Sequence, residues 1–327
     1  MNAMAWLVPL LCSALAPPRD RIVLLVDEIK AIRNVPVVVA ERLGYLDGVT
    51  VMNIRDDMPT AQMLMDGRVD AVMAYYHHNV VNRAAGRDFE AVVTLGLTPG
   101  VKVLVASHAR EKYKTPKDLK GSRIIAGGAG SAKTTVANAL LLAGGHGLSD
   151  YTRIANESKD RIAAALKSGG ADLVVAPTPD GDYYEAQGAG SVFADLTSAE
   201  GTRKVLGSLF PSSTVYMSAQ RAKAHPEIAQ RLADAFVKTL RFLHSHSAEE
   251  ILAVIPPEIT GPDRATYLRT LKAELPMFAG EGRMPAGAAE QELRVLGEFN
   301  PALKQVKVEE TYTNEFVDVS LGVADAR

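Results

Sequence analysis

The segment 127–134, GGAGSAKT, has the strongest chemical signature in the chain. It comes close to the phosphate-binding loop G-x-x-x-x-G-K-[ST], in which glycines allow backbone N–H groups to surround a phosphate. Ala132 occupies the position of the second glycine, and no strand ending in a free Asp follows to hold magnesium, because the apolar run 173–176 continues into Pro177. We therefore do not expect a nucleotide hydrolase.

Two other interpretations of this segment stay open. The free N–H groups at the start of the following helix, Ser131 to Thr134, can be directed at an anionic ligand. Alternatively, the segment is an ordinary glycine-rich connection in which Ser131 caps the helix. Under the first interpretation, Ser131, Ala132, Lys133 and Thr134 are candidate ligand-binding residues.

Two histidines and two tyrosines follow a short apolar run. His77 and His78 suggest a metal, but adjacent side chains point in different directions and no carboxylate or cysteine lies at ligand spacing. We expect neither a metal nor another cofactor. Tyr75 and Tyr76 are candidate walls of a ligand pocket, and packing in the core is an equal alternative.

The segment 177–181, PTPDG, has the composition of a turn. Asp180 and Tyr183 at its end are candidates that could face either a crevice or water. No nucleophile stands in a setting such as G-x-S-x-G, so nothing in the pattern favours catalysis.

A sequence pattern that occurs twice in the chain predicts the elements that position several of these candidate residues. Residues 64–76, LMDGRVDAVMAYY, and 166–180, LKSGGADLVVAPTPD, share the pattern L-x-x-G-x-[AV]-D, followed by three apolar residues and an alanine. Each copy predicts a helix that ends at a glycine and then a short buried parallel strand. Because ligands bind at the carboxyl ends of such strands, the repeat predicts two similar α/β halves that each offer a loop to a shared crevice.

Length and composition are those of a soluble protein with two domains. The 327 residues exceed the roughly 250–300 at which one core stops growing. Apolar residues make up 47% and charged residues 23% of the chain, as in ordinary globular proteins. The net charge of −2 and the lack of a Lys/Arg cluster give no indication of a nucleic-acid partner.

Residues 1–19 have the features of a secretory signal peptide. The uncharged apolar run from Ala3 to Ala16 ends in a small-x-small site and is too short to cross a bilayer. No Lys or Arg precedes it, and a frayed N-terminus is the alternative. Lipidation of Cys12 is not expected, because two leucines precede it where small residues are required. Cleavage would remove the chain's one cysteine and with it any thiol chemistry.

The remaining elements alternate between apolar strands and helices up to about residue 217 and are mostly helical afterwards. Asn34 is placed to cap the helix 35–43 and is kept as a candidate ligand contact. No polar constellation interrupts the amphipathic pattern after Ala222, so we interpret that region as a structural cap. The predicted strands are 21–26, 49–54, 71–74, 89–95, 101–106, 123–126, 151–155, 173–176, 191–196 and 213–217.

Several of these segments together resemble a known family. The run from Tyr113 to Ala143, with KTPKDLKGSRI and ANALLLAGG, followed by ALKSGGADLVVA, is similar to substrate-binding proteins of bacterial ABC importers. The similarity is to the NMT1/THI5-like group, which contains nitrate, taurine, alkanesulfonate and thiamine-pyrimidine binders. ERLGYL, LMDGRVDAV and the AAG turn at 84–86 extend it into the first half, so that it covers roughly residues 21–215.

The resemblance implies an α/β, type II periplasmic-binding-protein fold with two lobes, two crossings and a helical C-terminal region. We place the crossings near Ser107 and Ser212, which assigns 20–106 and 213–327 to lobe 1 and 107–212 to lobe 2. The ligand is then expected between the lobes, which close on it by hinge motion.

The resemblance also implies site residues. The family's second-lobe binding loop falls on Gly130, Ser131, Ala132 and Lys133, and Tyr76 and His77 follow the matching first-lobe strand. Relatives often have a second Ser and a His in that loop, where this chain has Ala132 and Lys133, and Lys133 could serve as a point charge for a carboxylate or sulfonate. The cysteine-rich run of some yeast relatives is missing from this sequence.

The expected function is that of a secreted, monomeric, non-enzymatic receptor. It would bind a small organic solute, such as a sulfonate, a carboxylate or a pyrimidine-like compound, and deliver it to a cognate ABC permease in the membrane. One alternative is an enzyme that acts on a small metabolite in the same cleft, which a strongly perturbed His77 or Asp27 beside a nucleophile would indicate. A sensory ligand-binding module is the other alternative.

Overall fold

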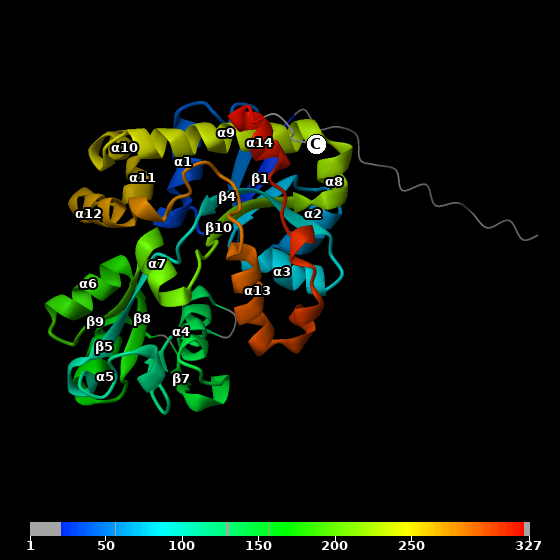
Figure 1. The fold of residues 1–327 in the computed structure, drawn as a ribbon. Helices are drawn as coiled ribbons and strands as arrows, with labels where there is room; N and C mark the ends of the chain where they lie inside the picture. Colours follow the sequence, from blue (N-terminus) through cyan, green and yellow to red (C-terminus); the bar gives the residue numbers. More distant parts are fainter. Residues whose placement is uncertain (1–20, 56, 129–130, 156, 324–327) are drawn as a thin grey trace, which may run out of the picture.

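The computed structural model of the protein describes residues 21–55, 57–128, 131–155 and 157–323, which form two α/β lobes (Figure 1). The predicted signal peptide and Cys12 lie outside the described residues. Each lobe is built around one five-stranded sheet, and the strand orders are β2-β1-β3-β10-β4 and β7-β6-β8-β5-β9. The predicted α/β architecture with a helical C-terminal region is confirmed.

The two sheets have the same internal arrangement. In the first, β1 pairs in parallel with β2 and β3, and β10 runs antiparallel between β3 and β4. In the second, β6 pairs in parallel with β7 and β8, and β5 runs antiparallel between β8 and β9. In each sheet, therefore, the strand that directly follows a crossing, β10 or β5, is the one inserted antiparallel. The strands are β1 (Ile22–Val26), β2 (Val49–Asn53), β3 (Ala71–Ala74), β4 (Phe89–Gly96), β5 (Val101–Ala106), β6 (Arg123–Ile125), β7 (Thr152–Ile154), β8 (Leu173–Pro177), β9 (Gly190–Leu196) and β10 (Ser213–Ser218).

Helices flank both sheets, and the C-terminal ones extend over the junction between the lobes (Figure 1). They are α1 (Val35–Arg42), α2 (Thr60–Met65), α3 (His77–Ala84), α4 (Ala132–Ala143), α5 (Lys159–Ser168), α6 (Thr178–Ala186), α7 (Ala199–Leu206), α8 (Ala219–Ala224), α9 (Pro226–Ser245), α10 (Ala248–Val254), α11 (Pro257–Thr260), α12 (Arg264–Glu274), α13 (Ala288–Phe299) and α14 (Glu315–Leu321). A short 3₁₀ helix, η1 (Ile32–Asn34), precedes α1.

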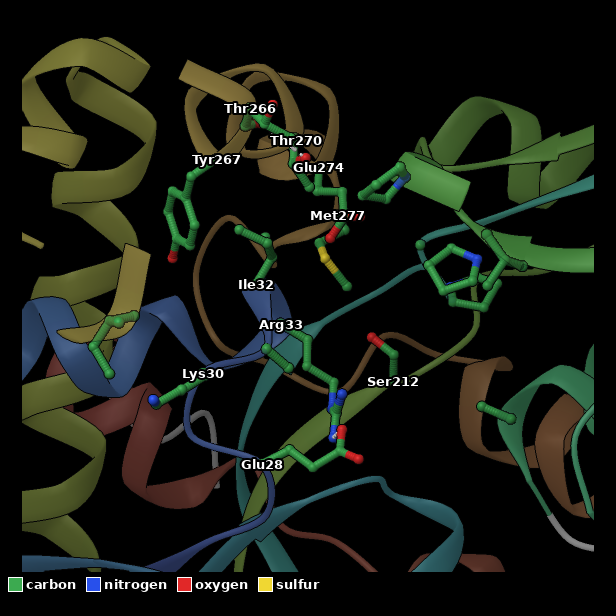
Figure 2. A pocket seen from close by; sticks show the side chains of 18 of the residues that line it. Glu28, Lys30, Ile32, Arg33, Ser212, Thr266, Tyr267, Thr270, Glu274 and Met277 are labelled. Carbon is green, nitrogen blue, oxygen red and sulfur yellow. Dashed lines mark hydrogen bonds and ion pairs between the residues drawn. The ribbon is translucent and has the colours of Figure 1, made fainter. Parts of the chain in front are cut away.

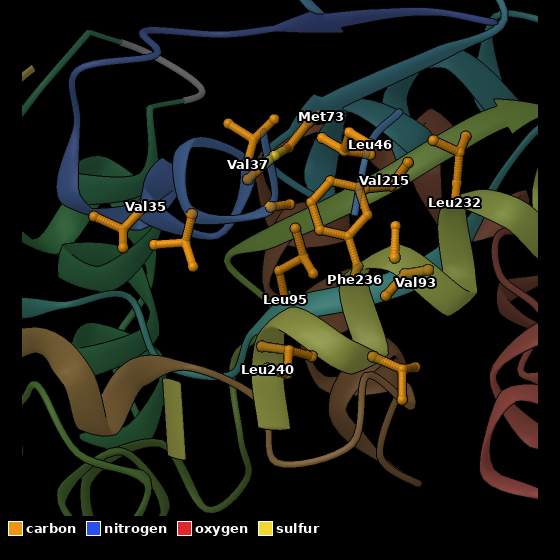
Figure 3. Close-up of a cluster of buried hydrophobic side chains, with 14 of the residues drawn as sticks. Val35, Val37, Leu46, Met73, Val93, Leu95, Val215, Leu232, Phe236 and Leu240 are labelled. Atoms are coloured by element: carbon orange, nitrogen blue, oxygen red, sulfur yellow. The ribbon is translucent and has the colours of Figure 1, made fainter. Parts of the chain in front are cut away.

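The long helix α9 closes the core of the first lobe. Its buried face is apolar at helical spacing, and Phe236 reaches into the cluster formed by the sheet residues Val93, Leu95 and Val215 (Figure 3). Burial of an aromatic side chain of this size contributes about 1.5–3 kcal/mol relative to exposure. This part of the C-terminal region fits the predicted structural cap.

The position of the first crossing was predicted wrongly. Strand β5 was assigned to lobe 1, but it pairs with β8 and β9 of the second sheet, so the chain crosses through residues 97–100 and not near Ser107. Strands β4 and β5 are both buried apolar runs separated by only four residues, and such a pattern does not say which sheet a strand joins.

The two crossings run side by side. The backbone N–H groups of Phe210 and Ser212 donate to the carbonyl oxygens of Leu97 and Gly96, each at 3.0 Å. A Cβ atom at position 96 would clash with the Ser212 hydroxyl, so a larger residue there would displace that side chain. The lobes are therefore joined by a short, hydrogen-bonded pair of segments.

The repeated segment performs the same structural task in both lobes. Its glycines, Gly67 and Gly169, end α2 and α5 in the left-handed region, with φ of +64° and +79°. Its aspartates each accept the backbone N–H of the neighbouring parallel strand, Asp70 from Val23 and Asp172 from Arg123, both at 2.8 Å. Each carboxylate thus fixes the start of two adjacent strands, at the edge away from their carboxyl ends.

The segment PTPDG is not a turn but the start of α6, which begins at Thr178. Pro179 lies in the first helical turn, where a residue without an N–H group breaks no helical hydrogen bond. Gly181 packs against β5, where a Cβ would lie 3.3 Å from Lys102 and 3.4 Å from Leu104. The composition of this segment therefore reflects a helix N-terminus under close packing.

Removal of the Asp70 carboxylate should destabilise the protein. Asp70 is buried and accepts from the Nε of Arg221 at 2.7 Å, so Asp70→Ala leaves the guanidinium of Arg221, whose side chain is only 15% exposed, and the Val23 N–H without their acceptor. We expect the free energy of unfolding in urea to fall by about 3–5 kcal/mol. The exposed pair of Asp57 with Arg55 provides the control, because Asp57→Ala should cost less than about 0.5 kcal/mol. Equal decreases in the free energy of unfolding of the two variants would contradict a stabilising role of the Asp70 carboxylate.

Candidate functional site

A cavity of about 610 Å³ lies between the lobes, and five parts of the chain form its walls (Figure 2). These are the loop after β1, the loop after β3, the two crossings, two loops of the second sheet, and the segment 259–277 of the C-terminal region. Both halves of the repeat contribute their strand-end loops, as the pattern predicts. The described residues that line it are Glu28, Lys30, Ala31, Ile32, Arg33, Tyr75, Pro99, Gly100, Val101, Ala132, Lys133, Pro177, Pro179, Ser212, Ile259, Thr260, Pro262, Asp263, Thr266, Tyr267, Thr270, Glu274 and Met277.

The loop after β1 supplies a fixed cation. The Arg33 guanidinium pairs with Glu28 at 2.8 Å and with Asp27 at 3.2 Å, and it lies 4.6 Å from the centre of the Tyr75 ring. Only 13% of its side chain is exposed. Arg33 therefore presents its charge to the cavity from a position held by two carboxylates and an aromatic face.

Asn34 holds this loop and does not cap α1. Because η1 precedes the helix, its side-chain amide reaches back and donates to the carbonyl oxygens of Asp27 and Glu28. The capping prediction is wrong for this reason. Asn34 is buried and is not among the lining residues, so it supports the loop that lines the cavity without facing the cavity itself.

Of the first-lobe candidates, the structure brings Tyr75 to the cavity but not Tyr76 or His77. Tyr76 is fully buried in the lobe 1 core, where its hydroxyl bonds with that of Thr311. His77 stacks on Tyr75 with ring centres 5.7 Å apart, and burial, assisted by the neighbouring His78, lowers the pKa of His77 to about 3. Its pKa is strongly perturbed, but it lines no part of the cavity.

Of the second-lobe candidates, Ala132 and Lys133 line the cavity, and Gly130 lies outside the described residues. Ser131 caps α4, with its Oγ accepting the N–H of Thr134 at 3.2 Å. The Thr134 hydroxyl donates to the carbonyl oxygens of Gly127 and Gly128, at 2.8 and 2.9 Å. Both hydroxyls therefore stabilise the loop itself, which favours the capping interpretation for these two residues.

Asp180 and Tyr183 are also not among the residues that line the cavity. The Tyr183 hydroxyl donates to Asp160 at 2.7 Å, and Lys159 lies over its ring, so this side chain is engaged with α5. The same helix instead contributes Pro179, and the strand before it ends with Pro177 at the cavity wall.

The C-terminal wall was missed by the sequence analysis. Helix α12 faces the cavity with Thr266, Tyr267, Thr270 and Glu274, so the structural-cap interpretation is wrong for this helix. Thr266, Thr270 and Glu274 recur every four residues, which marks one helical face. That spacing was a usable signal, but a polar face is more often directed at solvent.

Glu274 is an unusual member of this wall, because only 7% of it is exposed. Burial raises the pKa of its carboxyl to about 7, Asp182 adds to the rise, and the Thr178 hydroxyl and Arg33 oppose it. Near neutral pH the carboxyl therefore exchanges between its protonated and ionised forms.

Within the described ranges, no group of three or more His, Cys, Asp or Glu is arranged to hold a metal ion. Nor does any described helix have the length and apolar character needed to cross a membrane.

The chain is similar to one known family and to several solved structures. The family model described as NMT1/THI5 like matches residues 32–250, and a search of curated proteins finds no match. A protein of Bordetella bronchiseptica RB50 is 24% identical, with a TM-score of 0.73 over 93% of this chain and 98% of that one. The periplasmic aliphatic sulphonate binding protein SsuA of Escherichia coli is 17% identical, with a TM-score of 0.66 over 90% and 92%.

The desulfurization enzyme DszB is 18% identical, with a TM-score of 0.63 over 92% of this chain and 99% of that one. These similarities confirm the type II periplasmic-binding-protein fold. Because the structures include both a binding protein and an enzyme, the fold alone does not separate the two classes.

Substitution of Glu274 by Gln should stabilise the ligand-free protein at high pH. The pKa of the folded state, about 7, lies above the ordinary value of 4.5, so the folded protein holds this proton more tightly than the unfolded chain. The contribution of Glu274 to stability therefore falls as pH rises from about 4.5 through 7, by on the order of 3 kcal/mol. We expect the Tm of Glu274→Gln relative to wild type to increase between about pH 5 and pH 8.

Glu258→Gln is the control, because Glu258 is an exposed carboxylate on the neighbouring helix α11. Its Tm should follow that of wild type at both pH values. A Tm difference for Glu274→Gln that is independent of pH would contradict a buried, titrating carboxyl.

Proposed function

Because the chain belongs to the NMT1/THI5-like family, we propose that it is the extracytoplasmic solute receptor of an ABC importer. It binds a small organic anion between its lobes and delivers it to a permease in the membrane. The observation that carries this proposal is the cavity at the lobe junction, which is lined from both lobes and contains a fixed arginine.

The proposed mechanism is lobe closure. The paired crossings at 96–97 and 210–212 form a short connection about which the lobes can rotate. A ligand that contacts Arg33 and Tyr75 on one lobe and Lys133 on the other makes its full set of contacts only when the lobes are together. It therefore stabilises the closed arrangement through its higher affinity for that state.

Arg33 is the proposed anchor for the anionic group. A planar guanidinium pairs with a carboxylate or sulfonate through two parallel hydrogen bonds, which a lysine cannot reproduce. Lys30 and Lys133 add positive charge, whereas Glu28, Asp263 and Glu274 offset it. The preference for an anion thus depends on the placement of Arg33 and not on a net positive field. That the structurally similar Escherichia coli protein binds aliphatic sulphonates supports the choice of an anionic ligand.

A binding function is favoured over catalysis by the composition of the walls. None of the described residues that line the cavity is His or Cys. The Ser212 hydroxyl, which does line it, is buried and has no hydrogen-bond partner among the described residues that could act as a base. The enzyme DszB keeps catalysis as the alternative, and the experiment below separates the two.

The same proposal covers location and partners. We assign the segment 1–19 as a secretory signal and place the mature protein outside the cytoplasm, as for the periplasmic proteins of similar structure. It acts as a monomer that presents faces of both lobes to its permease, with no role for nucleic acid.

The test is a thermal-shift screen of purified mature protein against sulfonates, aromatic and aliphatic carboxylates, nitrate and pyrimidines. A ligand at ~100 times its Kd adds about 2.7 kcal/mol to stability, which is a shift of several degrees. Recovery of the bound compound unchanged after long incubation supports a receptor. Consumption of the compound would establish an enzyme, and the failure of every organic anion to bind would reject the proposal.

Arg33→Lys should weaken binding of the anion found in that screen by about 10- to 100-fold, because the forked hydrogen bonds are lost although the charge remains. Isothermal titration calorimetry measures this change. Arg55→Lys, in an exposed loop of the same lobe, should leave the Kd unchanged. If Arg33→Lys binds as tightly as wild type, Arg33 is not the anchor.

A further inference from the structure

Glu274 has no obvious role within the protein itself. It is the last residue of α12, where the negative end of the helix dipole disfavours a second negative charge. It makes no ion pair with any described residue, and its side chain lines the cavity (Figure 2). A buried carboxyl costs stability unless it is paired or hydrogen-bonded. The cost indicates that a partner reaches it from the cavity.

The groups around Glu274 do not supply a cationic partner, although burial, which raises the pKa of its carboxyl, is opposed by the Thr178 hydroxyl of α6 as a hydrogen-bond donor. Helix α12 packs against η1, α6, α10, α11 and the short 3₁₀ helix η5 (Leu275–Met277), and the one ionisable residue of the last two is the exposed Glu258 of α11. Arg33 of η1 and Tyr75, the residue after β3, also face the cavity. The charge of Arg33 opposes the rise that burial causes in the pKa of Glu274, but its ion pairs are with Asp27 and Glu28 and not with Glu274. From α6 the charged neighbour is Asp182, which repels a carboxylate. On α12 itself Tyr267 is uncharged, and Lys272 pairs with Glu249 of α10.

Two other polar groups that line the same cavity lack a hydrogen-bond partner among the described residues. They are the buried hydroxyls of Tyr267 and Ser212. In Figure 2, Glu274 and Tyr267 belong to the α12 wall, and Arg33 and Glu28 belong to the loop after β1. The cavity therefore has a cationic group on one wall, and the Glu274 carboxyl and the unpaired Tyr267 hydroxyl on another.

The walls between these groups are mostly apolar. Ile32, Tyr75, Ile259 and Met277 line the cavity, and its volume of about 610 Å³ is in the range that encloses organic ligands of many atoms. An inorganic anion or a very small acid would leave most of these surfaces in contact with water.

We propose that Glu274 is a specificity-determining residue that accepts a protonated amine, so that the ligand is a zwitterion with an acidic group at Arg33, an apolar body and an ammonium group at Glu274. This inference rests on the proposed receptor function and names the class of its ligand. An ammonium supplies both the charge and the hydrogen-bond donors that a desolvated carboxylate lacks.

The proposal has a pH signature. An ammonium pairs only with the ionised carboxyl, so its binding displaces the proton that Glu274 holds near neutral pH. Affinity for a zwitterion therefore rises as pH increases from about 6 to 8, by about tenfold for a carboxyl that titrates near 7. Affinity for an acid without an amine does not rise in this way.

The test uses organic acids in matched sets on one carbon frame, with 4-(aminomethyl)benzoate, 4-(hydroxymethyl)benzoate and 4-methylbenzoate as the aromatic set. Aliphatic ω-amino carboxylates and sulfonates, paired with their parent acids, form the aliphatic sets. Calorimetric Kd values at about pH 6 and pH 8 are compared for wild type, Glu274→Gln and the exposed control Glu258→Gln.

We expect the amine-bearing member of the best-binding set to bind wild type and Glu258→Gln at least tenfold more tightly than its parent acid. Glu274→Gln should lose both this preference and the pH dependence while it still binds the parent acid. That last result also shows that the variant is folded.

Equal or tighter binding of the parent acid, or of the hydroxymethyl member, overturns the inference and leaves the receptor proposal intact. A preference for the amine that survives in Glu274→Gln also overturns it. If no member of any set binds wild type, the inference fails together with the proposed capture of an organic anion.

Discussion

The fixed start of the parallel strands is the constraint on which the rest of the structure depends. Asp70 and Asp172 each accept a backbone N–H from the adjacent strand, and each is also bonded to a guanidinium, that of Arg221 or Arg123. This sets the register of β1 against β3 and of β6 against β8. Because the strands are short, fixing their N-terminal ends also fixes the positions at which the loops begin at their C-terminal ends. The loops that reach the cavity leave these strands at their carboxyl ends.

The strand that follows each crossing lies inside the sheet that it enters. β5 follows the first crossing and pairs with β8 and β9, and β10 follows the second crossing and pairs with β3 and β4, so ladder hydrogen bonds anchor the chain where it enters each lobe. Rotation of the lobes is therefore confined to the short segments that cross between them. The C-terminal helices add further contacts across the junction, since α12 packs on α6 and α13 packs on α4. The cavity is thus bounded by three bodies: two sheets and a helical wall.

The electrostatics of the cavity are set by burial and not by net charge. Arg33 stays charged in a largely buried position because two carboxylates and a ring face surround it. Glu274 lacks such company, and desolvation raises its pKa to about 7. Asn34 is buried too, and its amide holds the loop that presents Arg33. These three side chains therefore have different roles according to the partners that each one contacts.

The sequence by itself determined the elements and the family. Apolar runs of strand length, the αL glycines after α2 and α5, and the repeated L-x-x-G-x-[AV]-D pattern predicted two similar α/β lobes, and the resemblance to the NMT1/THI5-like group was correct. These features depend on local periodicity and backbone sterics, which a single segment carries within itself. Tyr75, Ala132 and Lys133 could be found because they lie beside such segments.

Only the tertiary structure decided which surfaces meet. It assigned β5 to the second sheet, turned Tyr76 into the core while Tyr75 lines the cavity, made a helix of PTPDG, and brought α12 to the site from more than two hundred residues beyond Arg33. The local sequence pattern predicts none of these outcomes. A buried strand has the same pattern in either sheet, and a polar helical face has the same pattern whether it contacts water or a cavity. The choice depends on the burial energy of contacts between distant segments, which exist only in the folded chain.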